Sequence, residues 1–262
     1  MAKGSYLAKH KERTAGTEEE YLHKKLPQVQ ISEEVRETFS EGKVLLIDKP
    51  LHWTSFDAVR KIRNTIKIKK VGHAGTLDPL ATGLLIICTG KFTKKINEYM
   101  SQEKEYTGSF TLGAVTPTYD KESAPQDFKD YSSVTEEKIN SAAKTFVGEI
   151  QQFPPIYSAI KKDGVALYEL ARRGEDAELQ ARTIKISVFE IININMPEVS
   201  FRVVCGTGTY IRSLAHDMGA VLGCGAYLSE LRRTRIGDYS VDDAVSIEGF
   251  LEQLSEKNTR SG

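Results

Sequence analysis

Cysteine is scarce in this chain and long hydrophobic runs are missing, and each shortage excludes a class of protein. Cys88, Cys205 and Cys224 are odd in number and far apart. They therefore predict reduced, mostly buried thiols, rather than a disulfide framework or a Cys-x-x-Cys metal site. No apolar stretch approaches the roughly 20 residues that a membrane span needs. Residues 1–25 lack the hydrophobic centre of a signal peptide, which predicts a cytoplasmic protein without membrane contact.

The chain also lacks a net charge, because 36 basic and 36 acidic side chains balance. This balance is only a weak argument against a nucleic-acid partner, since phosphate binding depends on local positive potential. Two clusters supply such potential: Arg60, Lys61, Arg63, Lys67, Lys69 and Lys70, and then Arg232, Arg233 and Arg235. A charge run is more often a solvated helix face. Because the first cluster leads into a glycine-rich loop, we expect Lys67, Lys69 and Lys70 to contact phosphates.

Composition and periodicity divide the chain into three parts. Residues 1–41 are polar and charged with little periodicity, which predicts a mobile or loosely attached extension. Residues 42–240 carry the regular patterns and form the expected catalytic domain, and 241–262 predict a short helix and tail. A chain of 262 residues with 40% hydrophobic content can bury one large core or two modest ones.

The order of expected helices and strands is mixed and favours an α+β fold. Short apolar or alternating runs predict strands at 43–48, 84–88 and 105–112, and an antiparallel pair around 184–188 and 201–205. Three- and four-residue spacing predicts helices at 93–100 and 165–173, one opened by Thr54 or Ser55 and reaching 66, one from Ser133 or Thr135 through Phe146, and one capped by Thr207 or Thr209 that continues to about 222.

The run Gly-His-Ala-Gly-Thr-Leu-Asp-Pro-Leu-Ala-Thr-Gly at residues 72–83 is the strongest functional signal. Pro79 disfavours the α region for Asp78, and Gly75 and Gly83 permit tight or left-handed backbone. The apolar run that follows predicts a buried strand behind the loop. An isolated Asp-Pro is most often an ordinary turn, but the whole run favours a catalytic loop that holds the Asp78 carboxylate.

Arg212 is placed unusually for a helix. It falls in the first turn of the helix predicted after Gly206-Thr207-Gly208-Thr209-Tyr210-Ile211. A cation there costs on the order of 0.3 to 1 kcal/mol unless an anion offsets the helix dipole. Asp78 or an RNA phosphate would serve as that anion. The alternative is an arginine that points into water, where a misplaced charge costs little.

These segments together resemble the TruB family of pseudouridine synthases. Residues 72–83 resemble motif II of those enzymes, 206–212 resemble their Gly-Thr-Tyr-Ile-Arg motif, 104–106 a Lys-x-Tyr element and 231–237 a late Leu-Arg-Arg strand. Further matches occur at Lys49-Pro50, Thr54-Ser55 and 157–172, so the resemblance extends over 43–237. It implies the pseudouridine synthase fold, with a mixed, mainly antiparallel central sheet flanked by helices.

The resemblance implies a reaction, which is the isomerisation of uridine to pseudouridine at position 55 in the tRNA T-loop, with base flipping. It makes Asp78 the nucleophile or base, pairs Arg212 with it, and assigns Tyr106 to stacking on the base and to proton removal. This reaction has no redox change and loses no group, so it needs a carboxylate, a cation and a closed pocket. We expect no cofactor, no metal and no obligatory protein partner, and a monomer that binds the T-arm stem-loop.

Three further residues receive roles from the resemblance. His73 helps to hold the flipped RNA loop open, Tyr210 borders the uridine pocket and Leu231 closes it. For His73 the alternatives are a hydrogen-bonded core histidine or a metal ligand, although no His-x-x-x-His or cysteine pair lies nearby to complete a metal site.

The chain departs from the family pattern in three places. His52 replaces a glycine after Lys-Pro, and Pro117 replaces an acid between two threonines. Only 25 residues follow Gly237, which is too few for the PUA RNA-binding domain of many relatives. We therefore expect this chain to bind the tRNA acceptor arm more weakly than those relatives do.

Two other functions are alternatives to this enzyme activity. A non-catalytic RNA-binding or RNA-chaperone module of the same fold would not require a carboxylate that faces RNA. A nucleotide-dependent enzyme is disfavoured because Gly206-x-Gly208 lacks the third glycine of a dinucleotide loop, and Gly90-Lys91 is followed by Phe92. The sequence leaves open whether Asp78 attacks the sugar, attacks the base or removes a proton.

Overall fold

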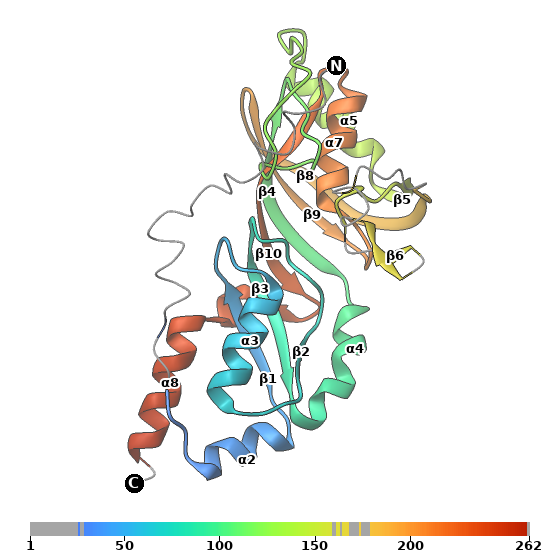
Figure 1. Ribbon diagram of the computed structural model, residues 1–262. Helices are drawn as coiled ribbons and strands as arrows, with labels where there is room; N and C mark the ends of the chain where they lie inside the picture. The colour runs from blue at the N-terminus through green and yellow to red at the C-terminus, as the bar shows by residue number, and fades with distance from the viewer. Residues whose placement is uncertain are drawn as a thin grey trace, which may run out of the picture.

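A ten-stranded mixed sheet runs the length of the molecule (Figure 1). The computed structural model describes residues 26, 29–158, 161–162, 164–167, 173 and 179–260. The strands are β1 (Val44–Lys49), β2 (Val71–His73), β3 (Ala81–Thr89), β4 (Lys104–Leu112), β5 (Gly148–Gln152), β8 (Arg182–Asn195), β9 (Glu198–Cys205), β10 (Ala226–Ile236), β11 (Tyr239–Ser240) and β12 (Val245–Ser246). A separate pair consists of β6 (Lys161–Lys162) and β7 (Val165–Ala166).

The strand order is β12-β1-β3-β10-β4-β9-β8-β5, with β2 paired to β3 and β11 paired to β10. Only the β1–β12 and β3–β10 pairs are parallel among these, and the others are antiparallel. The predicted mixed, mainly antiparallel sheet is therefore confirmed. The late strand β10 lies between the early strands β3 and β4, so the chain returns to the centre of the sheet.

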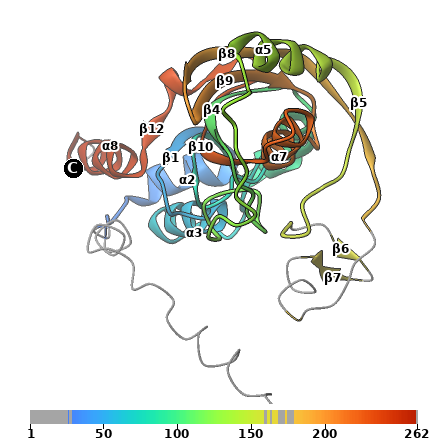
Figure 2. The ribbon, with the colours of Figure 1, turned by 90° about the horizontal axis from the view of Figure 1, so that it is seen from above.

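The helices divide between the two halves of the sheet (Figure 1). They are α2 (Glu33–Glu41), α3 (Ser55–Ile66), η2 (Gly90–Lys95), α4 (Ile96–Met100), α5 (Glu136–Thr145), α7 (Ile211–Val221), η3 (Val241–Asp243) and α8 (Ile247–Arg260). α2, α3, α4 and α8 accompany β1, β2 and β3, whereas α5 and α7 accompany β5, β8 and β9. Seen from above, β8, β9 and β4 curve around α7 (Figure 2).

The apolar run in β3 is continuous because both faces of that strand are buried. Leu84, Ile86 and Cys88 pack in a cluster with α4, whereas Leu85 and Ile87 pack with α3 and α8. A central strand covered on both faces reads as an uninterrupted apolar run. The catalytic loop predicted before this strand is thus attached to the rigid interior. All three cysteines are free and buried, as predicted.

Helix α3 begins with the expected cap. Thr54 accepts a hydrogen bond from the backbone of Asp57, and the Asp57 carboxylate accepts one from the backbone of Thr54, which completes a capping box. Of the two residues proposed to open α5, Thr135 is the cap. No helix of the described residues is long and apolar enough to cross a membrane.

Two sequence expectations differ from the structure. Residues 33–41, placed in a loosely attached extension, form α2, because Val35 and Phe39 lie four residues apart and bury one face against the core. Two apolar positions among charged residues were too few to signal a helix. The helix expected at 165–173 falls mostly outside the described residues, and Val165–Ala166 form strand β7 instead.

Candidate active site

The loop that carries Asp78 is held by hydrogen bonds on both sides of the carboxylate. Ser55, the first residue of α3, accepts from the Leu77 backbone N–H at 2.8 Å, and its hydroxyl donates to the Leu77 carbonyl at 3.1 Å. The Asp78 carbonyl accepts from Ala81 at 3.0 Å, and the Pro79 carbonyl accepts from the His52 backbone at 2.8 Å. Asp78 therefore sits on a fixed turn at the entrance to β3.

Arg233 forms the floor beneath this loop. Its side chain is buried, with 1% exposure, and donates from Nε to the Leu84 carbonyl at 2.7 Å. Its two terminal nitrogens donate to the Gly75 carbonyl at 3.1 Å and the Thr76 carbonyl at 3.4 Å. Gly75 has φ +94°, and a Cβ on Gly83 would lie 2.3 Å from the Arg233 carbonyl oxygen. Glycine at these two positions lets the loop and β3 approach β10.

Lys49 is a second buried cation near the loop. Its ammonium donates to the carbonyls of Pro50 at 2.9 Å and Trp53 at 2.6 Å. Burial lowers the pKa of Lys49 to about 8, and the nearby Asp78 carboxylate partly offsets that shift. The environment under the loop is therefore positive and largely dry.

Arg212 lies against Asp78. Its Nε is 2.9 Å from Asp78 Oδ2, in an ion pair that is not aligned as a hydrogen bond. The guanidinium is also anchored by the carbonyls of Thr118 and Tyr157, each at 3.1 Å. The Arg212 side chain is 7% exposed and that of Asp78 is 40% exposed. Of the anions considered for Arg212, the structure supplies Asp78, whose carboxylate stays accessible.

Asp120 is a site residue that the sequence reasoning missed. It is buried, and its Oδ2 lies 3.7 Å from Arg212 Nε, so two carboxylates flank one guanidinium. The Thr118 hydroxyl donates to Asp120 at 2.6 Å, and the Glu122 backbone donates to it at 3.0 Å. An aspartate that closes a turn in this way is a recognisable signal.

Helix α7 begins at Ile211 with Tyr210 at its cap position, and neither Thr207 nor Thr209 caps it. The Thr209 hydroxyl donates to the Gly206 carbonyl within its own turn. Gln152, at the end of β5, instead accepts from the Tyr210 N–H at 2.8 Å and donates to the Tyr210 carbonyl at 3.1 Å. The predicted caps were wrong because the partner comes from a distant strand.

A cavity of about 440 Å³ opens beside Asp78. Five predicted site residues line it together, namely Asp78, Tyr106, Tyr210, Arg212 and Leu231. Burial raises the pKa of both tyrosines above the ordinary value, so their phenols are neutral at neutral pH. The cavity thus combines the accessible Asp78 carboxylate and the Arg212 cation with tyrosine rings and apolar side chains, and Glu122 and several hydroxyl side chains also line it.

His73 is not among the residues that line this cavity. It ends β2, opposite Ile87 of β3, and burial lowers its pKa below the ordinary value. Among the described residues, no group of three or more His, Cys, Asp or Glu side chains is arranged to hold a metal ion. The RNA-contacting role of His73 stays a prediction.

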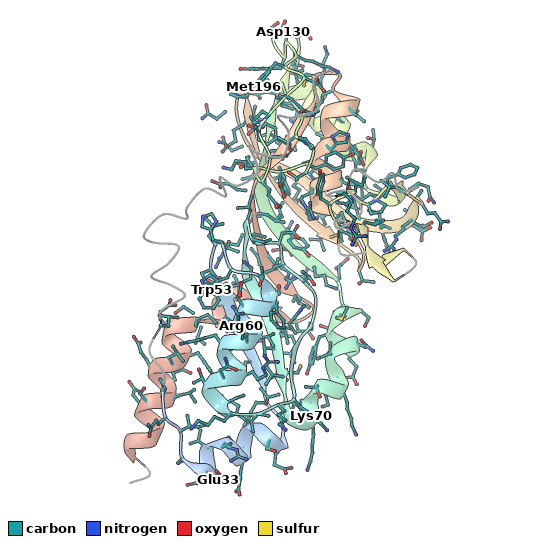
Figure 3. All side chains as sticks on the ribbon, in the orientation of Figure 1. Glu33, Trp53, Arg60, Lys70, Asp130 and Met196 are labelled. Atoms are coloured by element: carbon teal, nitrogen blue, oxygen red, sulfur yellow. The ribbon has the colours of Figure 1, made fainter. Side chains whose placement is uncertain are left out.

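Lys67, Lys69 and Lys70 are exposed, but they lie away from the cavity. Figure 3 places Trp53, just before α3, and Lys70, just beyond it, at opposite ends of that helix. The 12 residues of α3 separate these ends by about 18 Å. The cation run therefore does not lead to Asp78, and contact of these lysines with phosphates also stays a prediction.

The arginines of the second basic cluster bind other groups of the protein, and only Arg233 among them is buried. Arg232 makes two hydrogen bonds to Asp48, at 3.0 and 2.7 Å, and Arg235 donates to the Gly237 carbonyl at 2.8 Å. With Arg233 in the floor, all three arginines bind protein oxygens. In the first cluster Arg60 pairs with Asp57 at 2.6 Å. Because these arginines bind protein oxygens, fewer positive charges are available to bind a phosphate than the sequence clusters suggest.

Comparison with known proteins agrees with this geometry. A family model described as "TruB family pseudouridylate synthase (N terminal domain)" matches residues 63–211, and one described as "tRNA pseudouridylate synthase B C-terminal domain" matches 212–261. The tRNA pseudouridine synthase B of Flavobacterium johnsoniae is 55% identical over 225 residues, which is 83% of this chain and 98% of the relative. That of Chlorobaculum tepidum is 46% identical over 220 residues, 82% of this chain and 92% of the relative.

Solved structures show the same fold. One chain of a Cbf5-Nop10-Gar1 complex is 33% identical with a TM-score of 0.65, and the match covers 83% of this chain and 56% of that one. A chain of an H/ACA RNP bound to a substrate RNA containing 2'-deoxyuridine is 29% identical with a TM-score of 0.66, over 86% and 57% of the two chains. The present chain thus spans little more than half of each.

The central mixed sheet, with an aspartate and an arginine paired in a cavity, agrees with the pseudouridine synthase class that the family models describe. The resemblance seen in the motifs is confirmed across most of the chain by family models and close relatives. The chain belongs to the TruB family of pseudouridylate synthases, and it is an enzyme of that family.

Proposed function

We propose that this enzyme isomerises uridine 55 in the T-loop of tRNA to pseudouridine. The proposal is supported by relatives named tRNA pseudouridine synthase B that it matches over more than nine-tenths of their length. The observation that carries it is the Asp78–Arg212 ion pair of 2.9 Å, in which the arginine is buried and the aspartate remains accessible from the cavity.

Asp78 is the nucleophile or base of this reaction. The C1′–N1 glycosidic bond breaks, C1′ bonds to C5, C5 loses its proton and N1 gains one, so that atoms balance without a co-substrate. A carboxylate on a fixed turn is positioned to attack the sugar, attack the base or remove a proton. The Arg212 guanidinium lies 2.9 Å from this carboxylate, and the Thr118 and Tyr157 carbonyls keep the guanidinium in place.

The target uridine reaches Asp78 by flipping out of the T-loop. Extrusion costs a few kcal/mol, and stacking on an aromatic ring returns about 1 to 3 kcal/mol per base. Tyr106 and Tyr210 offer rings inside the cavity, and Leu231 closes one wall. Because burial keeps the Tyr106 phenol neutral, ring stacking fits Tyr106 better than action as a phenolate base.

Binding of the T-arm extends beyond the cavity. His73, at the end of β2, is proposed to occupy the stack that the flipped base vacates. Lys67, Lys69 and Lys70, exposed beyond the C-terminal end of α3, are proposed to contact backbone phosphates. These contacts would position the RNA without touching the reacting atoms.

Tritium release from C5-labelled uridine in a tRNA transcript tests the proposal. We expect release by the parent protein, none by Asp78→Asn, and comparable transcript binding by both. Asp130→Asn is the matched control, because Asp130 is exposed on a loop at the far end of the molecule (Figure 3). A transcript with cytidine at position 55 should release nothing.

Other results would overturn this assignment. Equal release by the parent and Asp78→Asn would remove Asp78 from the chemistry. Undiminished release from the cytidine-55 transcript would place the target elsewhere in the tRNA. Tight binding without release by any variant would favour an RNA-chaperone role.

A further inference from the structure

Two aromatic rings outside the recognised motifs stack on each other next to the site. The rings of Tyr119 and His216 have centroids 3.9 Å apart and planes inclined by 14°. Tyr119 belongs to the turn that also carries Thr118 and Asp120, and His216 lies on α7, one helical turn after Arg212. The stack therefore connects the element that carries Arg212 to the element that supplies two of its partners.

The backbone around Tyr119 is held in a demanding conformation. Tyr119 has φ +63°, in the left-handed region that a tyrosine rarely adopts. Its carbonyl accepts from the Leu228 N–H on β10 at 2.9 Å. The turn is thus attached to β10 through the backbone and to α7 through the ring.

The residues on either side of Tyr119 both face Arg212. The Thr118 carbonyl accepts from the guanidinium at 3.1 Å, and Asp120 lies 3.7 Å from Nε. Any rotation of the turn relative to α7 would move the Thr118 carbonyl and the Asp120 carboxylate away from Arg212. The long Arg212 side chain would then have fewer contacts to fix its position. Burial lowers the pKa of His216, so its ring is neutral at neutral pH and adds no like charge on the helix that carries Arg212.

We propose that the stacked rings of Tyr119 and His216 are a positioning pair, which fixes the guanidinium of Arg212 and thereby the Asp78 carboxylate for uridine isomerisation. Neither Tyr119 nor His216 is among the residues that line the cavity. The inference rests on the proposed function, because it concerns the geometry of the Asp78–Arg212 pair in that reaction.

Steady-state tritium release from the labelled tRNA transcript, with the full chain, tests the pair. His216→Ala and Tyr119→Gly should each lower kcat by about ten- to a hundredfold, the range expected for a small misplacement of a catalytic group, with little change in KM. Glycine accepts positive φ freely, so a loss in Tyr119→Gly reports the missing ring. The double variant should fall no further than either single one, since each removes the same contact.

Conservative variants separate positioning from chemistry. Tyr119→Phe and His216→Phe keep a flat ring and should retain kcat within about threefold, because stacking does not require the hydroxyl or the imidazole nitrogens. His216→Leu keeps volume without a flat face and should fall between Phe and Ala, and it also serves if the alanine variant does not fold. Tyr239→Ala, which removes a remote edge-to-face pair with Tyr99, is the matched control and should lower Tm but leave kcat unchanged.

Unchanged kcat in both His216→Ala and His216→Leu, with only a lower Tm, would overturn the inference. If the parent protein released no tritium, the proposed function would fail on its own. A crystal structure of His216→Ala would then decide: Arg212 displaced from Asp78 supports the pair, and an unaltered 2.9 Å contact refutes it.

Discussion

Two buried arginines, Arg233 and Arg212, contact the Asp78 loop, and they differ in the groups that they bind. Arg233, on β10, donates to three backbone carbonyls, also forms a side-chain hydrogen bond with Tyr106, and has 1% exposure. Arg212, on α7, contacts the carboxylates of Asp78 and Asp120 and lines the cavity. The first fixes where the loop runs, and the second places a positive charge beside the Asp78 carboxylate in the cavity. The site thus separates support of the backbone from electrostatic control.

Removing Arg233 should have the largest effect on folding. Arg233→Met leaves the carbonyls of Leu84, Gly75 and Thr76 without their donor inside the protein, and each such loss costs about 1 to 3 kcal/mol. We expect the unfolding free energy to fall by about 4 kcal/mol in urea titration. Arg232→Met on the same strand is the control and should cost about 1 kcal/mol or less, because its pair with Asp48 is partly exposed. If Arg233→Met and Arg232→Met lowered the unfolding free energy equally, the buried arginine would not support the fold more than the partly exposed one.

Arg212→Lys should reverse the pattern, with a large loss of activity and a small loss of stability. Lysine keeps the charge but cannot bind Asp78 and two carbonyls at once, since it lacks the rigid fork of arginine. We expect the single-turnover rate to fall about a hundredfold, equivalent to about 2.7 kcal/mol. A drop in unfolding free energy as large as that of Arg233→Met would show that both arginines are structural.

Much of the site was predictable because each motif is local. The loop of Asp78, the strand residues Tyr106 and Leu231, and the helix start with Tyr210 and Arg212 all reach one cavity, as the motif resemblance implied. A catalytic motif that lies within a short segment can be recognised from the sequence without knowledge of the fold. The strands could likewise be inferred from alternation and apolar runs.

The unpredicted parts depend on partners distant in sequence. Gln152 caps a helix 58 residues later, and Arg233 supports a carbonyl 158 residues earlier. Neither residue type signals such a role, since glutamine is an uncommon cap and an arginine in a basic cluster resembles a phosphate ligand. Asp120 differs from these two residues. The sequence around it is typical of a turn, but it does not show that Arg212 of α7 lies beside it.

A smaller effect should follow from the hydroxyl that ties α3 to the loop. Ser55→Ala removes the partner of the Leu77 N–H, and we expect about 1 kcal/mol less unfolding free energy by urea titration. Ser101→Ala, whose hydroxyl donates to Glu98 at the surface, should change stability by a few tenths of a kcal/mol at most. If the two serines cost the same, the loop does not depend on α3.

An effect of similar size concerns Asp217, on the same helix as Arg212. Burial raises the pKa of its carboxyl from 3.8 to about 6, so the folded protein holds this proton more tightly than the unfolded chain does. Its contribution to stability is complete below pH 3.8 and is lost as the pH rises through about 6. Asp217→Asn should therefore add about 1 kcal/mol at pH 7.5, after allowance for partial exposure. No gain at pH 7.5 relative to pH 4 would contradict the shift.

The central position of β10 has a consequence for biosynthesis. β3 and β4 leave the ribosome long before β10, yet β10 is the strand that joins them and brings the floor arginine with it. A nascent chain therefore contains Asp78 well before Leu231, which lines the cavity, and Arg233, which supports the loop. The cavity that Asp78, Arg212 and Leu231 line together is complete only after translation has passed this strand.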